Sequence, residues 1–507
     1  MRRKPSRAGP SGLPGLSGVL IYPNVRKVAF ASLGFLKVFE MFKQRLGLAD
    51  LSYLPEGRGD SVVSRKQGLL LGLASQAEVR SFDIAAFSVA YENDFVHIPE
   101  LLEAAGIPPL ASERNAVFPL VVCGGFTMSS NPLPVADFID AAVVGEAEVV
   151  VDRLLEAAEC ARASAGSRAD LLKEISEIEG VYVPSLGQQV VRRVWTETGR
   201  IAAEPVRQEV SHFGQMFLVE VGRGCGRGCR FCAAGNLYRP VRMRSRETVL
   251  ERCADHAKVG LVGTAVGDHP DIVAIVEWLE GEGRRVGISS LRADQVTAHI
   301  AGMLAACGVR TIAIAPETGS DRLRRRIGKG ITRQQIFDAV SYLSAAGIRT
   351  IKLYFMIGLP GETDEDVEAI VSLVSELRCI RGKSKLAVAV GPFVPKPHTA
   401  LQWAAFAERK VLRGRFKILS KIRRFTGCSL KLGSIDEAWT EAILARGDRS
   451  LSAFLLEAAV TQRSLRAVLK QSEVPDPHLP LDVRKPLPWD FIDSGVSKKR
   501  LLDEYAS

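Results

Sequence analysis

The chain lacks the features that mark membrane-spanning and disulfide-rich proteins. None of its uninterrupted apolar stretches reaches the roughly 18 residues of a transmembrane helix. Its nine cysteines are spread thinly over 507 residues, which argues against a disulfide framework and fits a reducing, cytoplasmic setting. Residues 1–7 have no apolar core of the secretory type. With 47% hydrophobic residues, the chain is expected to be globular and to form about two or three domains.

Acidic residues (57) are fewer than Lys and Arg residues (67), and the net charge of +10 hints at an anionic partner. The positive charge is concentrated in residues 409–424, which contain no acid and carry Leu412, Phe416 and Leu419 at helical spacing. We expect an amphipathic helix there, with a basic face that is either solvated or in contact with RNA. No membrane or DNA partner is expected. The basic residues of this segment are Arg409, Lys410, Arg413, Arg415, Lys417, Lys421, Arg423 and Arg424.

Three of the cysteines stand close together, at Cys225, Cys229 and Cys232. Their spacing is C-x3-C-x2-C, and Phe231 directly precedes the third cysteine. Thiolates on one short loop can bind three irons of a [4Fe–4S] cluster. The fourth iron then has no protein ligand and can hold a small molecule, which favours catalysis over electron storage.

A structural zinc site is the alternative interpretation of these cysteines. Zinc normally takes four ligands, and the nearest later candidates, Cys253 and His256, lack a compact spacing. Arg223, Arg227 and Arg230 favour deprotonated thiols in the loop. The sequence holds no second group of three cysteines, so a second cluster is not supported.

The amino-terminal third alternates between strand-like and helix-like segments. Apolar strands are predicted at 18–22, 83–89, 119–125 and 138–145, with helical patterns between them. This alternation predicts an α/β domain in which a doubly wound parallel sheet has helices on both faces. Ligands of such sheets bind beyond the carboxyl ends of the strands.

Six further apolar segments are predicted to be strands separated by helices, at 216–221, 259–264, 285–290, 310–316, 350–357 and 386–394. Six such units predict a partial (β/α)6 barrel, whose active site lies at the carboxyl ends of the strands. The cysteine loop directly follows the first of these strands. The predicted organisation is a disordered basic tail (1–17), a doubly wound domain (18–160), a linker (161–215), the partial barrel (216–400) and a helical C-terminal region (401–507).

The cysteine loop and the IGLPGET segment at 357–363 resemble motifs of the radical S-adenosylmethionine (SAM) superfamily. Segments 317–321, 393–399 and 488–497 narrow the likeness to an uncharacterised family of that superfamily, over nearly the whole chain after residue 18. The resemblance implies a [4Fe–4S] cluster whose open iron chelates the methionyl amine and carboxylate of SAM. An electron from a flavodoxin or ferredoxin type donor would then cleave the sulfonium to a 5′-deoxyadenosyl radical.

The resemblance also indicates which residues would hold SAM at the ends of the second to fourth barrel strands. Gly267 and Asp268 occupy the position of the motif that binds the methionine amine, although the usual Gly-Gly-Glu form is missing. Glu317 is a candidate for the ribose or the carboxylate, and Arg292, in the segment from Ser289, is a candidate for the methionine carboxylate. The alternative for these charged residues is a surface salt bridge.

The fifth strand and the cysteine loop supply the remaining candidates. An apolar strand ending at Ile357, with Gly358 and Gly361 in the turn after it, can place backbone groups against adenine. Phe231 in the cysteine loop is also expected to contact the cofactor. The catalytic and metal-binding candidates are Cys225, Cys229 and Cys232.

Residues 18–160 resemble the cobalamin-binding-like domain that precedes many radical SAM domains. The glycine pair Gly124 and Gly125 and the segment 144–148 carry this likeness. The cobalt-ligating D-x-H-x-x-G motif is absent after the first strand, and His97 is the single histidine of the region. Cobalamin is therefore a third candidate cofactor without histidine ligation, and another ligand or a scaffold role stays open.

The leading interpretation is a radical SAM enzyme whose substrate is not identified, with RNA or a ribosomal component as candidates. One alternative is a cobalamin-dependent radical SAM methyltransferase. Another is a non-catalytic iron–sulfur protein that binds RNA or assists assembly.

Overall fold

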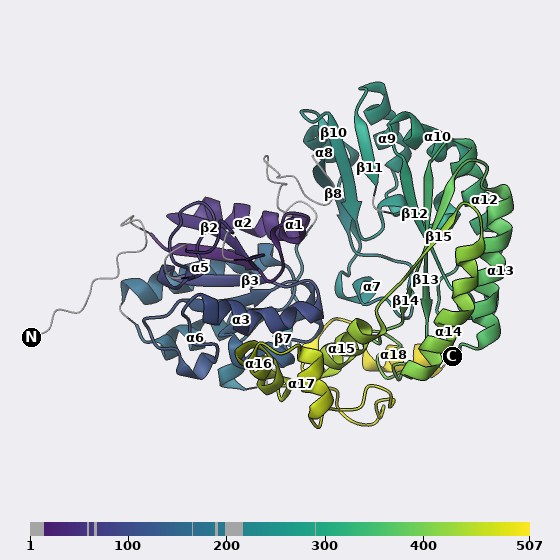
Figure 1. Cartoon of the computed structure of the whole chain (residues 1–507). Helices are drawn as coiled ribbons and strands as arrows, with labels where there is room; N and C mark the ends of the chain where they lie inside the picture. The colour runs from purple at the N-terminus through teal and green to yellow at the C-terminus, as the bar shows by residue number, and fades with distance from the viewer. Residues whose placement is uncertain are drawn as a thin grey trace, which may run out of the picture. The chain divides into compact units, whose positions relative to one another are not determined.

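The computed structural model describes residues 15–57, 60–64, 68–164, 166–187, 191–197, 216–288 and 290–506 (Figure 1). Most of the predicted basic tail, part of the predicted linker and Ser289 lie outside the described residues. The chain divides into two units. Unit 1 comprises the described residues up to Gly214 together with Ile443–Pro475 and Pro486–Gly495, and unit 2 comprises those of Gln215–Ala442, Asp476–Lys485 and Val496–Ser507. The domain boundaries expected from the sequence stay a prediction.

A six-stranded sheet in the order β2-β1-β3-β4-β5-β6 forms the centre of unit 1 (Figure 1). Its first five strands in chain order run parallel, and β6 is antiparallel to β5. All six residues of β1 are buried, as expected for a strand covered on both faces. The strands are β1 (Ser17–Tyr22), β2 (Leu48–Tyr53), β3 (Ile84–Ser88), β4 (Leu120–Gly124), β5 (Ala141–Val143) and β6 (Val181–Tyr182).

Helices cover this sheet, so the predicted doubly wound α/β fold is confirmed. α2 packs against α5, whereas α3 packs against α16, which comes from the C-terminal part of the chain. The helices of this unit are α1 (Arg26–Ala29), α2 (Leu33–Arg45), α3 (His97–Ala104), α4 (Phe126–Ser130), α5 (Ala147–Ala163), α6 (Arg168–Ser176), α16 (Leu451–Thr461) and α17 (Leu465–Gln471).

Two late segments of the chain complete unit 1. β7 (Val191–Arg192) pairs in parallel with β16 (Ile492–Asp493), and the Asn131 side chain donates to the carbonyls of Ala445 and Gly447 at 3.1 and 2.7 Å. The C-terminal region therefore contributes to the amino-terminal fold. The predicted helices are present in this region, which also contains the short strands β15 (Cys428–Leu432) and β16.

At the carboxyl edge of the unit 1 sheet, the backbone at Val89 packs closely against the glycine pair Gly124 and Gly125. The Val89 amide donates to the Gly124 carbonyl at 2.8 Å, and the Thr127 hydroxyl donates to the Val89 carbonyl at 2.9 Å. Gly125 has a φ of +111°, and a Cβ atom there would lie 2.3 Å from the Val89 carbonyl oxygen. Gly125 is therefore required for close backbone packing.

The expected six strands of the partial barrel are confirmed in unit 2 (Figure 1). Together with the additional strands β9 and β15, these six strands form two sheets, β11-β10-β8-β9 and β12-β13-β14-β15. The Leu291 amide joins the two sheets by donating to the Ala313 carbonyl at 3.0 Å. β9 is antiparallel to β8, and β15 extends the other edge in parallel. The strands are β8 (Phe217–Arg223), β9 (Arg242–Met243), β10 (Lys258–Gly263), β11 (Arg285–Ile288), β12 (Thr311–Glu317), β13 (Thr350–Ile357) and β14 (Lys385–Pro392).

Helices alternate with these strands, as the sequence predicted. Side-chain caps mark several helix starts, such as Thr332 with Gln335 and Thr363 with Asp366. The helices are α7 (Ala234–Leu237), α8 (Arg246–Cys253), α9 (Ile272–Gly281), α10 (Ala298–Ala306), α11 (Asp321–Arg326), α12 (Arg333–Ala345), α13 (Asp364–Ile380), α14 (Arg409–Leu419), α15 (Ile435–Arg446), whose last residues belong to unit 1, and α18 (Lys498–Ala506). Among the described residues, none of the helices has the length and apolarity needed to cross a bilayer.

The packing at Gly125 generates a stability prediction with a matched control. Gly125→Ala should lower the free energy of unfolding by about 1–3 kcal/mol for backbone strain and by about 1–3 kcal/mol more for the clash with Val89. Gly187→Ala is the control, because Gly187 has a similar conformation (φ +91°) and, apart from its chain neighbours, none of the described residues has an atom within 4 Å of the new Cβ. Urea unfolding of both variants measures the difference, and equal losses would contradict the packing argument.

Candidate active site

The predicted cysteine loop lies at the carboxyl end of β8, on the rim where active sites of parallel barrels are found. Cys225, Cys229 and Cys232 are partly exposed free thiols. The Cys232 amide donates to the Cys229 carbonyl at 3.1 Å, which makes a tight turn. The loop is held from two sides, because the Arg230 amide donates to the Ile327 carbonyl at 3.0 Å and the Leu401 amide donates to the Arg230 carbonyl at 3.3 Å.

The three thiols lie close enough to influence one another electrostatically. Burial is the largest cause that raises the pKa of Cys229, and the charge of Cys232 adds to it while Lys329 and Arg292 oppose it. Burial also raises the pKa of Cys232, where backbone hydrogen bonds from Gly235 and Ala234 act in the opposite direction. The cations that act on Cys229 thus come from other segments, Arg292 from the loop after β11 and Lys329 from the connection between α11 and α12.

The donor set fits a [4Fe–4S] cluster in its chemistry, since three uncombined thiols share one short loop at the rim. In the described part of the chain, no three His, Cys, Asp or Glu side chains already converge as a group that could hold a metal ion. The three thiols therefore lie on one loop but are not arranged around a common point as metal ligands would be.

Two arginines of the loop region are paired with carboxylates, and the charge of Cys225 also acts on one of them, Arg227. Arg223 pairs with Glu220 at 2.7 Å, and Arg227 pairs with Asp268 at the end of β10 at 2.5 and 2.9 Å. The hydrogen bonds that Arg227 donates to Asp268 raise the pKa of Arg227. Burial acts to raise the pKa of Asp268, but the hydrogen bonds and charge of Arg227 outweigh it, and the pKa is lowered overall. Arg227 and Asp268 therefore form a charged pair that ties the cysteine loop to the next strand end.

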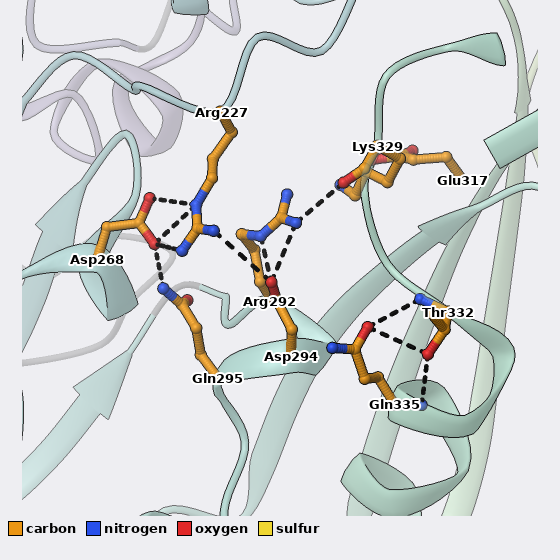
Figure 2. A network of polar contacts seen from close by, with 9 residues as sticks. All are labelled: Arg227, Asp268, Arg292, Asp294, Gln295, Glu317, Lys329, Thr332 and Gln335. Atoms are coloured by element: carbon orange, nitrogen blue, oxygen red, sulfur yellow. Dashed lines mark hydrogen bonds and ion pairs between the residues drawn. The ribbon is translucent and has the colours of Figure 1, made fainter. Parts of the chain in front are cut away.

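This pair continues into a chain of polar contacts along the rim (Figure 2). Gln295 donates to Asp268, and Arg227 lies 3.7 Å from a carboxylate oxygen of Asp294. Arg292 donates to both oxygens of the Asp294 carboxylate, at 3.0 and 3.2 Å. The network thus joins the loop after β8 to the ends of β10 and β11.

The same network reaches β12 through Lys329 (Figure 2). Arg292 donates to the Lys329 carbonyl at 2.9 Å, and the Lys329 ammonium group lies 2.7 Å from the Glu317 carboxylate. Burial raises the pKa of Glu317, while Lys329 and Arg292 hold it down. Glu317 has a φ of +66°, an uncommon conformation for a non-glycine residue. Strained backbone of this kind is concentrated at functional sites.

The remaining candidates lie in the turn after β13 and in an apolar cluster. Ile357 is fully buried at the end of the strand, and the Gly358 amide donates to the Glu362 carboxylate at 2.5 Å. Gly361 accepts a hydrogen bond from Arg322 at 3.1 Å. Phe231 packs against the apolar cluster Leu323, Ile327, Leu359, Phe393, Leu401 and Ala404, beside Met356 and Tyr505.

The structure therefore links Asp268, Arg292 and Glu317 in one network and places Phe231 apart from it in an apolar environment. Gly267 lies in the 3-10 turn η7 (Val266–Asp268), where a Cβ atom would meet the Gln295 side chain at 2.3 Å. Sequence analysis did not single out Lys329, Asp294 or Gln295. Asp294 and Gln295 could have been found, because they are polar residues that closely follow the third barrel strand. Nothing in the local sequence marked Lys329 as a site residue.

Comparisons with known proteins identify the family of the chain. Residues 34–184 match the family model of the N-terminal domain of radical SAM proteins, and residues 219–374 match that of the radical SAM superfamily. An uncharacterised protein of Methanocaldococcus jannaschii is 31% identical over 442 residues, which cover 85% of this chain and 90% of that protein. The chain belongs to the radical SAM superfamily.

As a member of this superfamily the protein is an enzyme that uses a [4Fe–4S] cluster and SAM. It is also similar to a tRNA-2-methylthio-N(6)-dimethylallyladenosine synthase of Pelotomaculum thermopropionicum, with 25% identity over 289 residues. That match covers 52% of this chain and 61% of the synthase, so the chain spans about three fifths of that relative.

A solved structure confirms the fold. The radical SAM methyltransferase TsrM from Kitasatospora setae, with tryptophan and a SAM analogue bound, has a TM-score of 0.52 at 16% identity. The match covers 74% of this chain and 72% of TsrM. Another TsrM structure contains cobalamin and a [4Fe–4S] cluster. Both predictions, a radical SAM fold and a preceding domain of the cobalamin-binding-like type, are therefore confirmed as statements about fold.

The ligand set generates a prediction on iron content. Replacing Cys225, Cys229 or Cys232 with alanine should reduce the iron of the anaerobically reconstituted protein from about four atoms per chain to near zero, because a cube held by two thiolates is not retained. Cys428→Ala is the matched control, since this thiol is also partly exposed but lies on β15. Iron and sulfide analysis measures the outcome, and full iron in one of the three variants would remove that cysteine from the ligand set.

Proposed function

We propose that the enzyme binds its cluster through Cys225, Cys229 and Cys232, cleaves SAM reductively, and uses the resulting radical to activate an RNA or a ribosomal component. The observation that carries this proposal is the polar network that joins Arg227 of the cysteine loop to the ends of β10, β11 and β12. It brings the loop and the candidate SAM ligands onto one stretch of rim.

Each part of the network supports a particular role. Arg227 and Asp268 fix the cysteine loop against β10. Arg292 uses two of its nitrogens on Asp294 and Lys329, and within the described residues its Nη1 has no hydrogen-bond partner, so it can donate to the methionine carboxylate. The Glu317 carboxylate is occupied by Lys329, and we therefore assign Glu317 to positioning that cation beside Cys229.

The bound cofactors supply the chemistry that the side chains lack: the reduced cluster provides one electron that cleaves SAM to methionine and a 5′-deoxyadenosyl radical, which takes a hydrogen atom from the substrate. The residues of the rim would hold SAM in place for this reaction. An electron donor of the flavodoxin or ferredoxin type would meet the enzyme at each turnover.

An RNA or ribosomal substrate is supported by charge and by relatives. The Pelotomaculum relative is named for a tRNA modification. In this chain α14 and the following turn η9 (Ser420–Arg424) carry the predicted basic segment. Arg415 is buried and donates to the Glu362 carboxylate at 2.6 Å, whereas Arg409 pairs with Asp436 and lies over the Trp439 ring.

The other cations of this segment form an exposed basic face. Lys421 lies 3.6 Å from Glu368, and within the described residues the rest of the face has no acidic partner. Lys410, Arg413 and Lys417 are three and four residues apart, which places them on one side of α14, and the other three cations follow in η9. An uncompensated row of charges of this kind suits the phosphates of RNA. The exposed basic residues are Lys410, Arg413, Lys417, Lys421, Arg423 and Arg424.

The radical reaction is tested by its product. With dithionite and SAM, the anaerobically reconstituted enzyme should form 5′-deoxyadenosine, detected by mass spectrometry, and Cys229→Ala should reduce the yield to background. Adding RNA extracted from small ribosomal subunits or a tRNA pool should raise the yield. An intact cluster that gives no product with any of these additions would argue against the proposal.

A second candidate, cobalamin-dependent methyl transfer, is favoured by the fold likeness to TsrM. Against it stands the lack of a histidine in the loop after β1, where the chain reads Pro23-Asn24-Val25. The same assay separates the two candidates, because methyl transfer from SAM yields S-adenosylhomocysteine. That product together with copurified cobalamin would favour the methyltransferase.

The basic face generates a binding prediction. Reversing Lys410, Arg413 and Lys417 to glutamate should weaken binding of a tRNA pool about tenfold or more and reduce the slope of log K against log salt by about 3, as expected for three lost phosphate contacts. The matched control reverses Lys258 and Arg285, exposed cations at the amino ends of β10 and β11. Filter binding over a salt series measures both, and equal effects of the two sets would indicate only non-specific attraction.

A further inference from the structure

Unit 2 contains a cavity of about 260 Å³ against the outer side of the cysteine loop. Its wall includes Arg230, which lies between the second and third cysteines. Arg326 and Ile327 come from the end of α11, and Pro360 comes from the turn after β13. Leu401, Glu504 and Tyr505 complete it, the last two from α18.

The cavity is built into the support of the cluster loop. The Arg230 amide donates to the Ile327 carbonyl, and the Leu401 amide donates to the Arg230 carbonyl, so three wall residues are joined through the backbone. Arg326 lies directly against Gly361, where a Cβ atom would be 2.6 Å from its Nη1. A ligand in this cavity would therefore touch the cysteine loop and the turn after β13 together.

The two arginines of the wall give the cavity a positive charge. Among the described residues neither the Arg230 nor the Arg326 guanidinium group has a hydrogen-bond or ion-pair partner, in contrast to those of Arg322 and Arg324 on the same helix as Arg326. The acid of the wall, Glu504, is engaged by Arg500 at 2.8 Å. Two guanidinium groups that are not paired with a carboxylate can bind a phosphate by charge-assisted hydrogen bonds.

The rest of the wall is apolar and aromatic. Tyr505 packs against the cluster that contains Ile327 and Leu401, and it also lies near Trp403, with ring centroids 5.6 Å apart. Aromatic side chains beside arginines are the usual platform for unstacked bases of RNA. The volume is below the roughly 300–1,000 Å³ of pockets for drug-sized ligands, which suits one nucleotide rather than a longer segment.

We propose that this cavity receives one nucleotide of the RNA substrate, with the phosphate on Arg230 and Arg326 and the base against Tyr505. This inference rests on the proposed function for the identity of the substrate. It places a substrate nucleotide against the cysteine loop itself, whereas the basic face of α14 supplies only general attraction.

Uridine 5′-monophosphate is the probe, because a pyrimidine nucleotide does not imitate the adenosine of SAM. Calorimetry with the full chain should show binding at or below millimolar concentration, equally with and without saturating SAM, and no binding of uridine. Arg326→Gln should weaken the binding about tenfold or more, as expected for one lost charge-assisted contact. Arg325→Gln is the matched control, since Arg325 is an exposed neighbour on α11 that does not line the cavity.

The base contact is tested separately with ribose 5-phosphate. The wild type should bind uridine 5′-monophosphate more tightly than ribose 5-phosphate, and Tyr505→Leu should remove most of this difference while leaving the affinity for ribose 5-phosphate unchanged. A retained difference would overturn the assignment of the base to Tyr505.

Three results would overturn the nucleotide site as a whole: no binding at millimolar nucleotide, equal affinity of Arg326→Gln and the wild type, or displacement of the nucleotide by SAM. The last would assign the cavity to the cofactor. Failure of the proposed radical reaction is seen separately, because it would leave the nucleotide binding intact and abolish 5′-deoxyadenosine formation.

Discussion

The shape of the short loop after β8 is the constraint on which the rest of unit 2 depends. Its glycines are conformationally free in the unfolded chain, and ordering them on folding costs conformational entropy. The loop therefore needs contacts with other segments to hold the three thiols in place. Gly224 shows how closely it is confined, since its φ is +86° and a Cβ atom would lie 2.4 Å from the Tyr238 carbonyl oxygen. The loop is fixed from outside by the backbone of Ile327 and Leu401 and by the pair of Arg227 with Asp268.

Electrostatics at the rim follow from the same arrangement. Burial opposes the ionisation of Cys229, and the cations that compensate it, Lys329 and Arg292, are themselves held by Glu317 and Asp294. Glu317 and Asp294 therefore hold these cations in place, while the negative charge of Glu317 itself adds to the causes that raise the pKa of Cys229 and of Cys232. This arrangement explains why several charged residues of the rim are buried or half-buried and yet paired with one another.

The sequence predicted what depends on local pattern. The six barrel strands were found because each is a short apolar run, and the cysteine loop was found because its spacing is local. β2 was missed because Asp50 interrupts it; this carboxylate is buried and satisfied by the amides of Ala74 and Ser75, more than twenty positions later in the chain. The links of Arg227 with Asp268 and of Lys329 with Glu317 were equally beyond reach, since they depend on which strand ends meet in space.

The pairing of β7 with β16 has a consequence for how the protein is made. Arg193 donates to the Ser494 carbonyl across 301 positions of sequence, and α16 packs on α3 of the first unit. On the ribosome, the amino-terminal sheet is synthesised long before these partners, so the face of α3 that packs on α16 stays uncovered until residues 451–461 have been made. The two units therefore cannot mature one after the other, and nascent chains that stop before residue 495 would be natural clients of chaperones.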